Sequence, residues 1–386
     1  MDQQEPSTHG STFPTDVYRS IDPRGFYDKI LKQQLRPDGR KLRAFRTVAV
    51  SDLLEDYKGA AELSDEDGIV ISSVRVTVGD THVNCAITAT PQFVDVEMAE
   101  SYSPEPLIDV EVELPKQVQS YIYDANGHSA NLNFTVATIL ATVLNSDDIL
   151  PSEQLIFVEN TNETTSECKD DICSYLSWRN FRWKLDINLI CEEYDGNLLD
   201  LSVMATTYAL RKAMLPVILL EYNEAMGVYE MRILDRETLE QTQNPQVSCY
   251  INKKHKNTQQ ANKWIKDNKK AIEKQIETQL MEENMASQLI KHMGNWHYLG
   301  RHLKLLAVPF TVTFLRYNQD TFLVDPTAEE ERLGTNVSVY CLKRADGSSQ
   351  TQILNMTCCN GITTEIYQSL RQMAIDIIDC ISTNDI

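Results

Sequence analysis

Apolar and polar residues alternate along residues 69–78 and again along 83–87, on either side of Gly79-Asp80. Alternation with a period of two is typical of strands that bury one face, and a pair containing glycine suits a two-residue hairpin turn. The pattern therefore predicts a β-hairpin. A further strand at 108–114 and a mostly apolar helix at 132–144 are predicted after it, so this part of the chain reads as strands followed by a helix.

The same order recurs near the C-terminus. Apolar runs predict four strands, at 305–315, 322–325, 337–342 and 352–356. A helix is then predicted over 361–381, because its apolar residues fall on one stripe at helical spacing. The stripe consists of Ile366, Leu370, Met373, Ile377 and Cys380. Two such rounds indicate an α+β fold of duplicated β-sheet and helix units around one continuous core.

The middle of the chain is predicted to hold a further strand and helix unit. A strand at 181–192 leads to the tight turn Tyr194-Asp195-Gly196-Asn197, with a return strand from Leu198 and a helix at 202–214. Tyr-Asp-Gly-Asn is turn chemistry, since Gly and Asn tolerate left-handed backbone conformations. Shorter elements are also predicted: strands at 154–158, 216–220 and 231–234, and a helix at 26–34.

Three segments stand apart by composition. Residues 1–24 are polar and rich in proline, and we expect an N-terminal tail. Residues 159–176 are polar and are predicted to be an insertion. Residues 237–300 interrupt the strand pattern with Lys, Asn and Gln and are predicted to be a second insertion. The rest of 25–386 is expected to form one domain.

Composition and charge restrict the function. The 386 residues carry a formal net charge of −20, which opposes binding of a phosphate backbone over a broad basic surface but leaves room for a local basic patch. No apolar run reaches the roughly 18 residues of a membrane span, and no secretory signal is recognisable, so we expect a soluble intracellular protein without a membrane partner. The nine cysteines lack zinc-site spacing and are expected to be reduced. Gly-rich nucleotide-binding patterns are absent.

The sharpest candidate for chemistry is Glu329-Glu330-Glu331, which follows the predicted strand 322–325 and an Asp-Pro turn. Three adjacent carboxylates could ligate a magnesium ion or take part in acid–base catalysis. The alternative is a solvated turn at the end of a strand. We favour the turn, because the sequence offers no fourth or fifth ligand nearby.

Other acidic and histidine residues are weaker candidates. Asp195 is expected to be a turn residue, and Asp186 and Asp200 are expected to cap or pair. Histidines at five-residue spacing do not share a helix face, so we predict no metal site from His292, His297 and His302.

Basic residues give two further hypotheses. Four arginines near the N-terminus are expected to form internal salt bridges and turns rather than RNA contacts: Arg36, Arg40, Arg43 and Arg46. The lysine-rich insertion offers RNA-binding candidates, namely Lys253, Lys254, Lys256 and Lys263. The alternative is a solvated insert, because aromatic residues that could stack on bases are scarce there.

Four stretches in order resemble the RNase PH family. They are Arg36-Pro37-Asp38-Gly39-Arg40 with Phe45-Arg46-Thr47, the hairpin around Gly79-Asp80, residues 186–200, and residues 324–331. The Tyr-Asp-Gly-Asn-Leu-Leu-Asp and Asp-Pro-Thr-x-Glu-Glu-Glu forms are closer to the exosome ring subunits of the family than to its bacterial enzyme. The resemblance implies the ribosomal-S5-domain-2-like fold. In active members it implies phosphorolysis of RNA from the 3′ end, with phosphate held at a helix start by an arginine.

Transferred to this sequence, the resemblance puts the catalytic positions in doubt. The first catalytic carboxylate falls on Glu331, but the second falls on Val337, which can neither bind a metal nor move a proton. The phosphate-binding motif falls near Ala141-Thr142-Val143, and no arginine occurs from Gln119 to Leu150. The resemblance therefore predicts neither catalytic nor phosphate-binding residues here, and no cofactor or metal.

The function implied is a non-catalytic subunit of the eukaryotic exosome ring. The implied partners are other RNase PH-like ring subunits, small S1/KH-type RNA-binding cap subunits, a processive 3′ exoribonuclease, and RNA passing through the channel. The implied location is the nucleus, nucleolus and cytoplasm. Two alternatives stay open: a phosphorolytic 3′ exoribonuclease whose site is completed by a partner, and an RNA-binding adaptor acting through the lysine-rich insertion.

Overall fold

The structure is a computed structural model. It describes residues 15–54, 68–93, 106–116, 132–155, 181–216, 218–223, 228–233, 300–344, 351–358 and 361–382. The second predicted insertion and its four lysine candidates lie outside the described residues, apart from residue 300, and so does the insertion predicted at 159–176. Among the helices of the described ranges, none is long and apolar enough to cross a membrane.

The first sheet contains the predicted hairpin. Its five strands lie in the order β1 (Val48–Asp52), β2 (Ile69–Val78), β3 (Thr81–Phe93), β5 (Phe181–Glu193) and β4 (Ile108–Glu113). All neighbours are antiparallel except β4 and β5, which are parallel. Gly79 has a φ of 58°, a left-handed conformation that suits the tight turn between β2 and β3.

The second sheet is built from the C-terminal strands. It is antiparallel, in the order β11 (Phe322–Val324), β10 (Ala307–Arg316), β12 (Thr335–Arg344) and β13 (Thr351–Cys358). Two smaller antiparallel pairs join β6 (Met214–Pro216) to β9 (Gly300–His302) and β7 (Ile218–Asn223) to β8 (Val228–Ile233).

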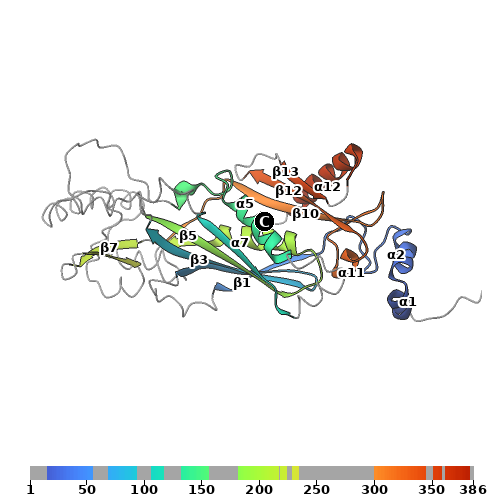
Figure 1. Cartoon of the computed structure of the whole chain (residues 1–386), viewed down its shortest axis with the longest axis horizontal. Helices are drawn as coiled ribbons and strands as arrows, with labels where there is room; N and C mark the ends of the chain where they lie inside the picture. The colour runs from blue at the N-terminus through green and yellow to red at the C-terminus, as the bar shows by residue number, and fades with distance from the viewer. Residues whose placement is uncertain are drawn as a thin grey trace, which may run out of the picture.

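Helices fill the layers around the two sheets. Helix α7 (Leu198–Lys212) contacts β2 and β3 of the first sheet and β10 of the second, so it lies between the sheets. Helix α5 (Leu132–Leu144) packs on β4, and α12 (Thr364–Ser382) covers the other face of the second sheet, as Figure 1 shows. This arrangement confirms the predicted α+β fold of sheet and helix units.

Alternate side chains of β10 pack against different helices on the two faces of the second sheet. Val308, Phe310, Val312 and Phe314 pack against the buried side of α12. The residues between them face α7, where Thr313 bonds to the fully buried carboxylate of Asp200. The strand is therefore buried from Ala307 to Leu315, and only its last residue, Arg316, is partly exposed.

Several local predictions are wrong. The predicted return strand from Leu198 is instead the first turn of α7, because Asn197 takes a left-handed conformation and ends the extended chain. Gln154 ends a short 3-10 helix, Ser152–Gln154, rather than beginning a strand; residues 156–158 lie outside the described part. The sequence analysis also missed helix α1 (Thr15–Ile21) in the polar N-terminal segment and the edge strand β1.

Candidate functional site

The three adjacent glutamates lie on a short helix, not on a turn. Helix α11 (Ala328–Glu331) begins after Thr327, whose side chain accepts a hydrogen bond from the Glu330 backbone N–H. The Glu330 carboxylate in turn accepts from the Thr327 backbone N–H at 2.9 Å, which completes a capping box. Successive residues of a helix point about 100° apart, so the three carboxylates diverge.

Each glutamate consequently has its own set of donors. Glu329 accepts from Arg19 of α1 and, at 2.9 Å, from the Tyr27 hydroxyl of α2 (Pro23–Leu31). Glu330 forms a fully buried ion pair with Arg36. No two of these carboxylates share a donor, and the described residues contain no group of three His, Cys, Asp or Glu that could hold a metal ion.

Glu331, where the resemblance places the first catalytic carboxylate, is held by neutral donors. It accepts from the Tyr194 hydroxyl, from the backbone N–H of Asn197 at 3.1 Å and from the Asn336 side-chain amide at 3.2 Å. Burial raises the pKa of Glu331 above its usual value, and its hydrogen bonds only partly offset this. Burial and the adjacent Glu331 charge also raise the pKa of Tyr194.

Asp325 is the centre of the ionic network, and the sequence analysis did not select it. Its side chain is fully buried and accepts from Arg46, Arg40 and the Asn197 amide at 2.8–3.0 Å. Burial alone would raise the pKa of Asp325, but hydrogen bonds from Arg46 and the charge of Arg46 outweigh it and the pKa is lowered. With a φ of 51°, Asp325 also turns the chain from β11 towards α11.

The turn that contains Asp195 packs against the start of α11. Asp195 pairs with Arg46 at 3.1 Å and accepts a hydrogen bond from the Ala328 backbone N–H at 3.3 Å. Gly196 has a φ of 85°, and a Cβ there would lie 2.3 Å from the Pro326 carbonyl oxygen. Asp195 is therefore a turn residue, as predicted, but it leads into a helix and not into a hairpin.

The predicted arginine pairs are confirmed at three positions. Arg36 binds Glu330, Arg40 binds Asp38 and Asp325, and Arg46 joins Asp195 to Asp325; these are the pairs of one network. Arg36 also donates to the carbonyl oxygens of Val324 at 2.6 Å and Asp325 at 3.0 Å. Arg43, the fourth arginine, is exposed and has no partner in the described part of the chain.

Val337 lies in the hydrophobic core. It is fully buried in β12, opposite Phe314 of β10, and belongs to the cluster that packs under α12. A carboxylate placed there would be surrounded by apolar side chains. The valine is therefore a packing residue, and it leaves Glu331 without a second acidic side chain at the predicted spacing.

The region predicted to match the phosphate-binding motif is helical and lacks a cation. Ala141-Thr142-Val143 lie in the last turn of α5, and the Thr142 hydroxyl donates to the Thr138 carbonyl within the same helix. No arginine or lysine occurs in α5. Neither a guanidinium nor a helix N-terminus is therefore present at these three residues.

The remaining candidates have structural partners. Asp186 pairs with Lys184 at 2.8 Å on the first sheet. Asp200 is fully buried and accepts from the backbone N–H and hydroxyl of Thr313, both at 2.8 Å. His302 ends β9, and the other two histidines lie outside the described residues.

The chain is similar to a known protein family and to solved structures. Residues 60–216 match the model of the 3′ exoribonuclease family, domain 1, of the RNase PH type. The chain is also similar to a chain of the Archaeoglobus fulgidus exosome with RNA bound to the active site, with a TM-score of 0.52 and 15% identity over 96% of this chain and 98% of that one. A chain of an archaeal exosome core gives a TM-score of 0.49 and 15% identity over 94% and 96%.

At such low identity the first of these structures establishes the fold, and the family model locates the first domain of that fold at residues 60–216. The matched stretch contains the first sheet from β2 onwards, together with α5 and α7. The chain therefore has the α+β RNase PH fold.

Proposed function

We propose that this chain is a ring subunit of the RNA exosome that contributes interfaces and part of the RNA channel without a phosphorolytic site of its own. In this role it supports 3′-to-5′ processing and decay of RNA by the assembled complex. The RNase PH fold and the matched first domain support the ring assignment. Among ring subunits, the start Phe13-Pro14-Thr15-Asp16-Val17-Tyr18 with Leu35-Arg36-Pro37 resembles the one numbered forty-three in fungi and eight in vertebrates.

The surroundings of the two predicted catalytic positions, Glu331 and Val337, are the main support for a non-catalytic role. Val337 is buried in the core, and Glu331 is occupied by three donors from Tyr194, Asn197 and Asn336. A carboxylate that holds a metal or transfers a proton needs an accessible lone pair and a partner group. Glu331 has no acidic partner at the predicted spacing, and α5 supplies no cation for phosphate.

The proposal extends to partners and location. The chain would sit between other RNase PH-like subunits over interfaces of the size typical of permanent complexes. Small S1/KH-type cap subunits and a processive 3′ exoribonuclease would bind the assembled ring, in the nucleus, nucleolus and cytoplasm. The net charge of −20 suits neighbours that present basic surfaces.

The test combines assembly with activity. The tagged chain is co-expressed with RNase PH-like ring subunits, and complexes are measured by native mass spectrometry. The ring is then incubated with RNA and inorganic phosphate without any hydrolytic exoribonuclease, using wild type and Glu331→Gln. We expect a hexameric ring and the same RNA degradation with wild type and Glu331→Gln.

A folded monomer with no affinity for such subunits would contradict the ring assignment. Phosphate-dependent release of nucleoside diphosphates that Glu331→Gln abolishes would favour a phosphorolytic enzyme.

A further inference from the structure

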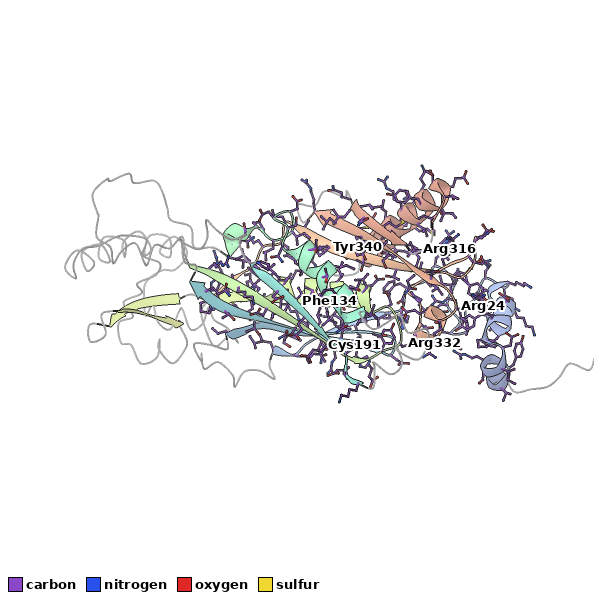
Figure 2. All side chains as sticks on the ribbon, in the orientation of Figure 1. Arg24, Phe134, Cys191, Arg316, Arg332 and Tyr340 are labelled. Atoms are coloured by element: carbon purple, nitrogen blue, oxygen red, sulfur yellow. The ribbon has the colours of Figure 1, made fainter. Side chains whose placement is uncertain are left out.

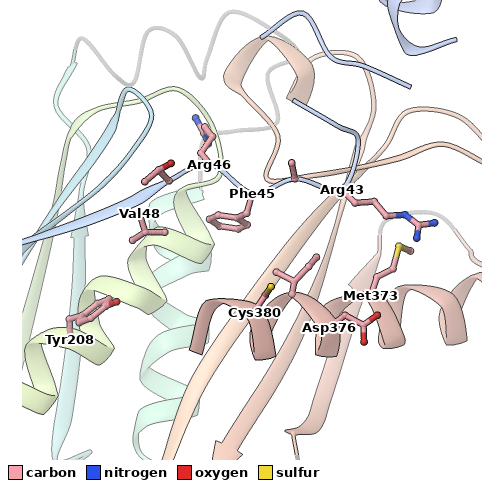
Figure 3. Close-up of a pocket in the computed structure, with 11 residues that line it drawn as sticks. Arg43, Phe45, Arg46, Val48, Tyr208, Met373, Asp376 and Cys380 are labelled. Carbon is pink, nitrogen blue, oxygen red and sulfur yellow. The ribbon is translucent and has the colours of Figure 1, made fainter. Parts of the chain in front are cut away.

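A cavity of about 690 Å³ lies between α7, α12 and the segment that precedes β1, and Arg46 of the ionic network also lines it. Figure 3 shows the segment 43–48 along one side, Tyr208 of α7 below it, and Met373, Asp376 and Cys380 of α12 opposite. Its size is in the range of ligand-binding pockets in proteins. The cavity therefore has room for one or two side chains of another molecule.

Most of the cavity wall is apolar. Phe45 and Val48 contribute from the N-terminal side, and Met373 and Ile377 contribute from α12. All four are partly buried, so the protein itself does not cover them completely. Apolar surface that lines a cavity favours an apolar side chain as occupant, since contact removes it from water.

One positive charge at the cavity has no partner among the residues that the structure describes. Arg36, Arg40 and Arg46 are all paired with carboxylates. Arg43 is exposed, lines the same cavity, and pairs with none of the residues that the structure describes. A guanidinium in this state can bind a carboxylate from another molecule through two parallel hydrogen bonds.

The cavity adjoins an edge strand of the first sheet. Val48 lines the cavity and is also the first residue of β1, an edge strand whose only neighbour among the described strands is β2. Residues 49–52 of β1 are exposed. An extended peptide can pair with such an edge through its backbone while its side chains enter an adjacent pocket.

The charges at the cavity favour a peptide over RNA. Asp376 lines the wall formed by α12 and is exposed, with a hydrogen bond from Gln372 at 2.9 Å. This carboxylate would repel a phosphate backbone, whose binding relies on several cations. Among the lining residues, Arg46 is already paired with carboxylates, so Arg43 and Asp376 are the charges left for a ligand. Together with the apolar wall they match a peptide with an apolar side chain next to an acidic one.

We propose that this cavity and the free edge of β1 form a docking site for an extended segment of a partner protein, which places an apolar side chain in the cavity and an acidic side chain on Arg43. The site does not depend on ring assembly, since all its residues belong to this chain. Its failure and that of the ring proposal are therefore distinguishable, because each is measured in a separate experiment.

The test uses the full chain and fluorescence anisotropy. The probe is a fluorescein-labelled octapeptide with a central phenylalanine–glutamate pair and flanking valine and threonine, which favour an extended conformation. Two comparison peptides replace the glutamate by lysine or the phenylalanine by serine. The variants are Arg43→Glu and Asp376→Lys, with Arg371→Glu as the matched control. Arg371 is exposed on α12 and does not line the cavity.

We expect the phenylalanine–glutamate peptide to bind best, and Arg43→Glu to weaken it about tenfold or more, because a charged hydrogen bond is replaced by repulsion. Asp376→Lys should tighten its binding, and Arg43→Glu should favour the lysine peptide. Changes in peptide affinity that go in opposite directions for the two variants cannot come from misfolding.

The proposal is overturned if the wild type does not bind at millimolar peptide, if the three peptides bind equally, or if Arg43→Glu behaves like Arg371→Glu. Binding of labelled single-stranded RNA that is lost in Arg43→Glu, without peptide binding, would assign the site to nucleic acid.

Discussion

Replacing Arg36 by methionine tests whether the ionic network holds the fold together. The Arg36 side chain is 0% exposed and that of Glu330 is 1% exposed. Its guanidinium donates to both Glu330 oxygens and to the carbonyl oxygens of Val324 and Asp325. Val324 ends β11, Asp325 follows it, and Glu330 lies in α11, so all three are almost 300 positions further along the chain. Arg36 therefore connects the N-terminal segment to the second half of the molecule through an ion pair and hydrogen bonds.

The loss of unfolding free energy in Arg36→Met follows from these contacts. Leaving one member of a buried ion pair without its partner costs about 3–5 kcal/mol. Each of the two carbonyl oxygens loses a donor as well, at about 1 kcal/mol each. The buried methionine side chain recovers about 2 kcal/mol through its apolar surface. Arg36→Met should therefore lower the free energy of unfolding by about 4 kcal/mol, a large part of a typical total of roughly 5–15 kcal/mol.

Equilibrium urea unfolding, followed by tryptophan fluorescence and circular dichroism, measures this difference. Arg371→Met is the control, because its exposed side chain should change stability by less than about 0.5 kcal/mol. Combining Arg36→Met with Glu330→Leu removes both charges, so the double variant should be less destabilised than the sum of the single variants. A loss below about 1 kcal/mol for Arg36→Met, or strict additivity with Glu330→Leu, would refute the reasoning.

Three further outcomes are expected. Burial raises the pKa of Asp200, so at pH values between the ordinary and the raised pKa the native state binds more protons than the unfolded state, and the free energy of unfolding should fall as the pH rises through this range. Asp200→Asn should remove this part of the pH profile measured by urea unfolding, and an unchanged profile would contradict the prediction. Val337→Asp should leave the protein largely unfolded by circular dichroism, because it places a charge in an apolar core, whereas Val337→Ala should cost only about 2–3 kcal/mol. Gly196→Ala should lower the thermal midpoint much more than Gly39→Ala, since both glycines have positive φ but only Gly196 lies against another backbone; equal shifts would refute this explanation.

The sequence predicted the regular elements well where one physical pattern dominated. The hairpin of β2 and β3 has strict alternation and a glycine turn, and α12 has a single apolar stripe, so both were located closely. The start of α7 was misplaced because its first residues, Leu198-Leu199-Asp200, do not distinguish a strand from a buried helix. The left-handed conformation of Asn197 decides between them, and the turn residues alone do not specify its direction.

The ionic network was predicted only in part, for a related reason. The arginines were expected to pair internally, but apart from Asp38 beside Arg40 their carboxylate partners lie far away along the chain, and spacing along a chain does not encode such contacts. Asp325 was treated as part of an Asp-Pro turn, although its buried side chain is the acceptor for two arginines. An arginine-rich segment between a helix and a strand is the signal that could have pointed to a buried acidic partner.

The three glutamates show why local composition misleads about chemistry. In the sequence they form a cluster, but on α11 each points to a different element: Glu329 to α1 and α2, Glu330 to Arg36, and Glu331 to the turn before α7. A site that exchanges ligands needs convergent groups with free lone pairs, whereas a joint between segments needs divergent groups with complete hydrogen bonding. Helix α11 meets the second requirement, because each of its three carboxylates is held by donors of its own. The same carboxylates that suggest catalysis by their number therefore act, by their geometry, as the contacts that connect both halves of the chain.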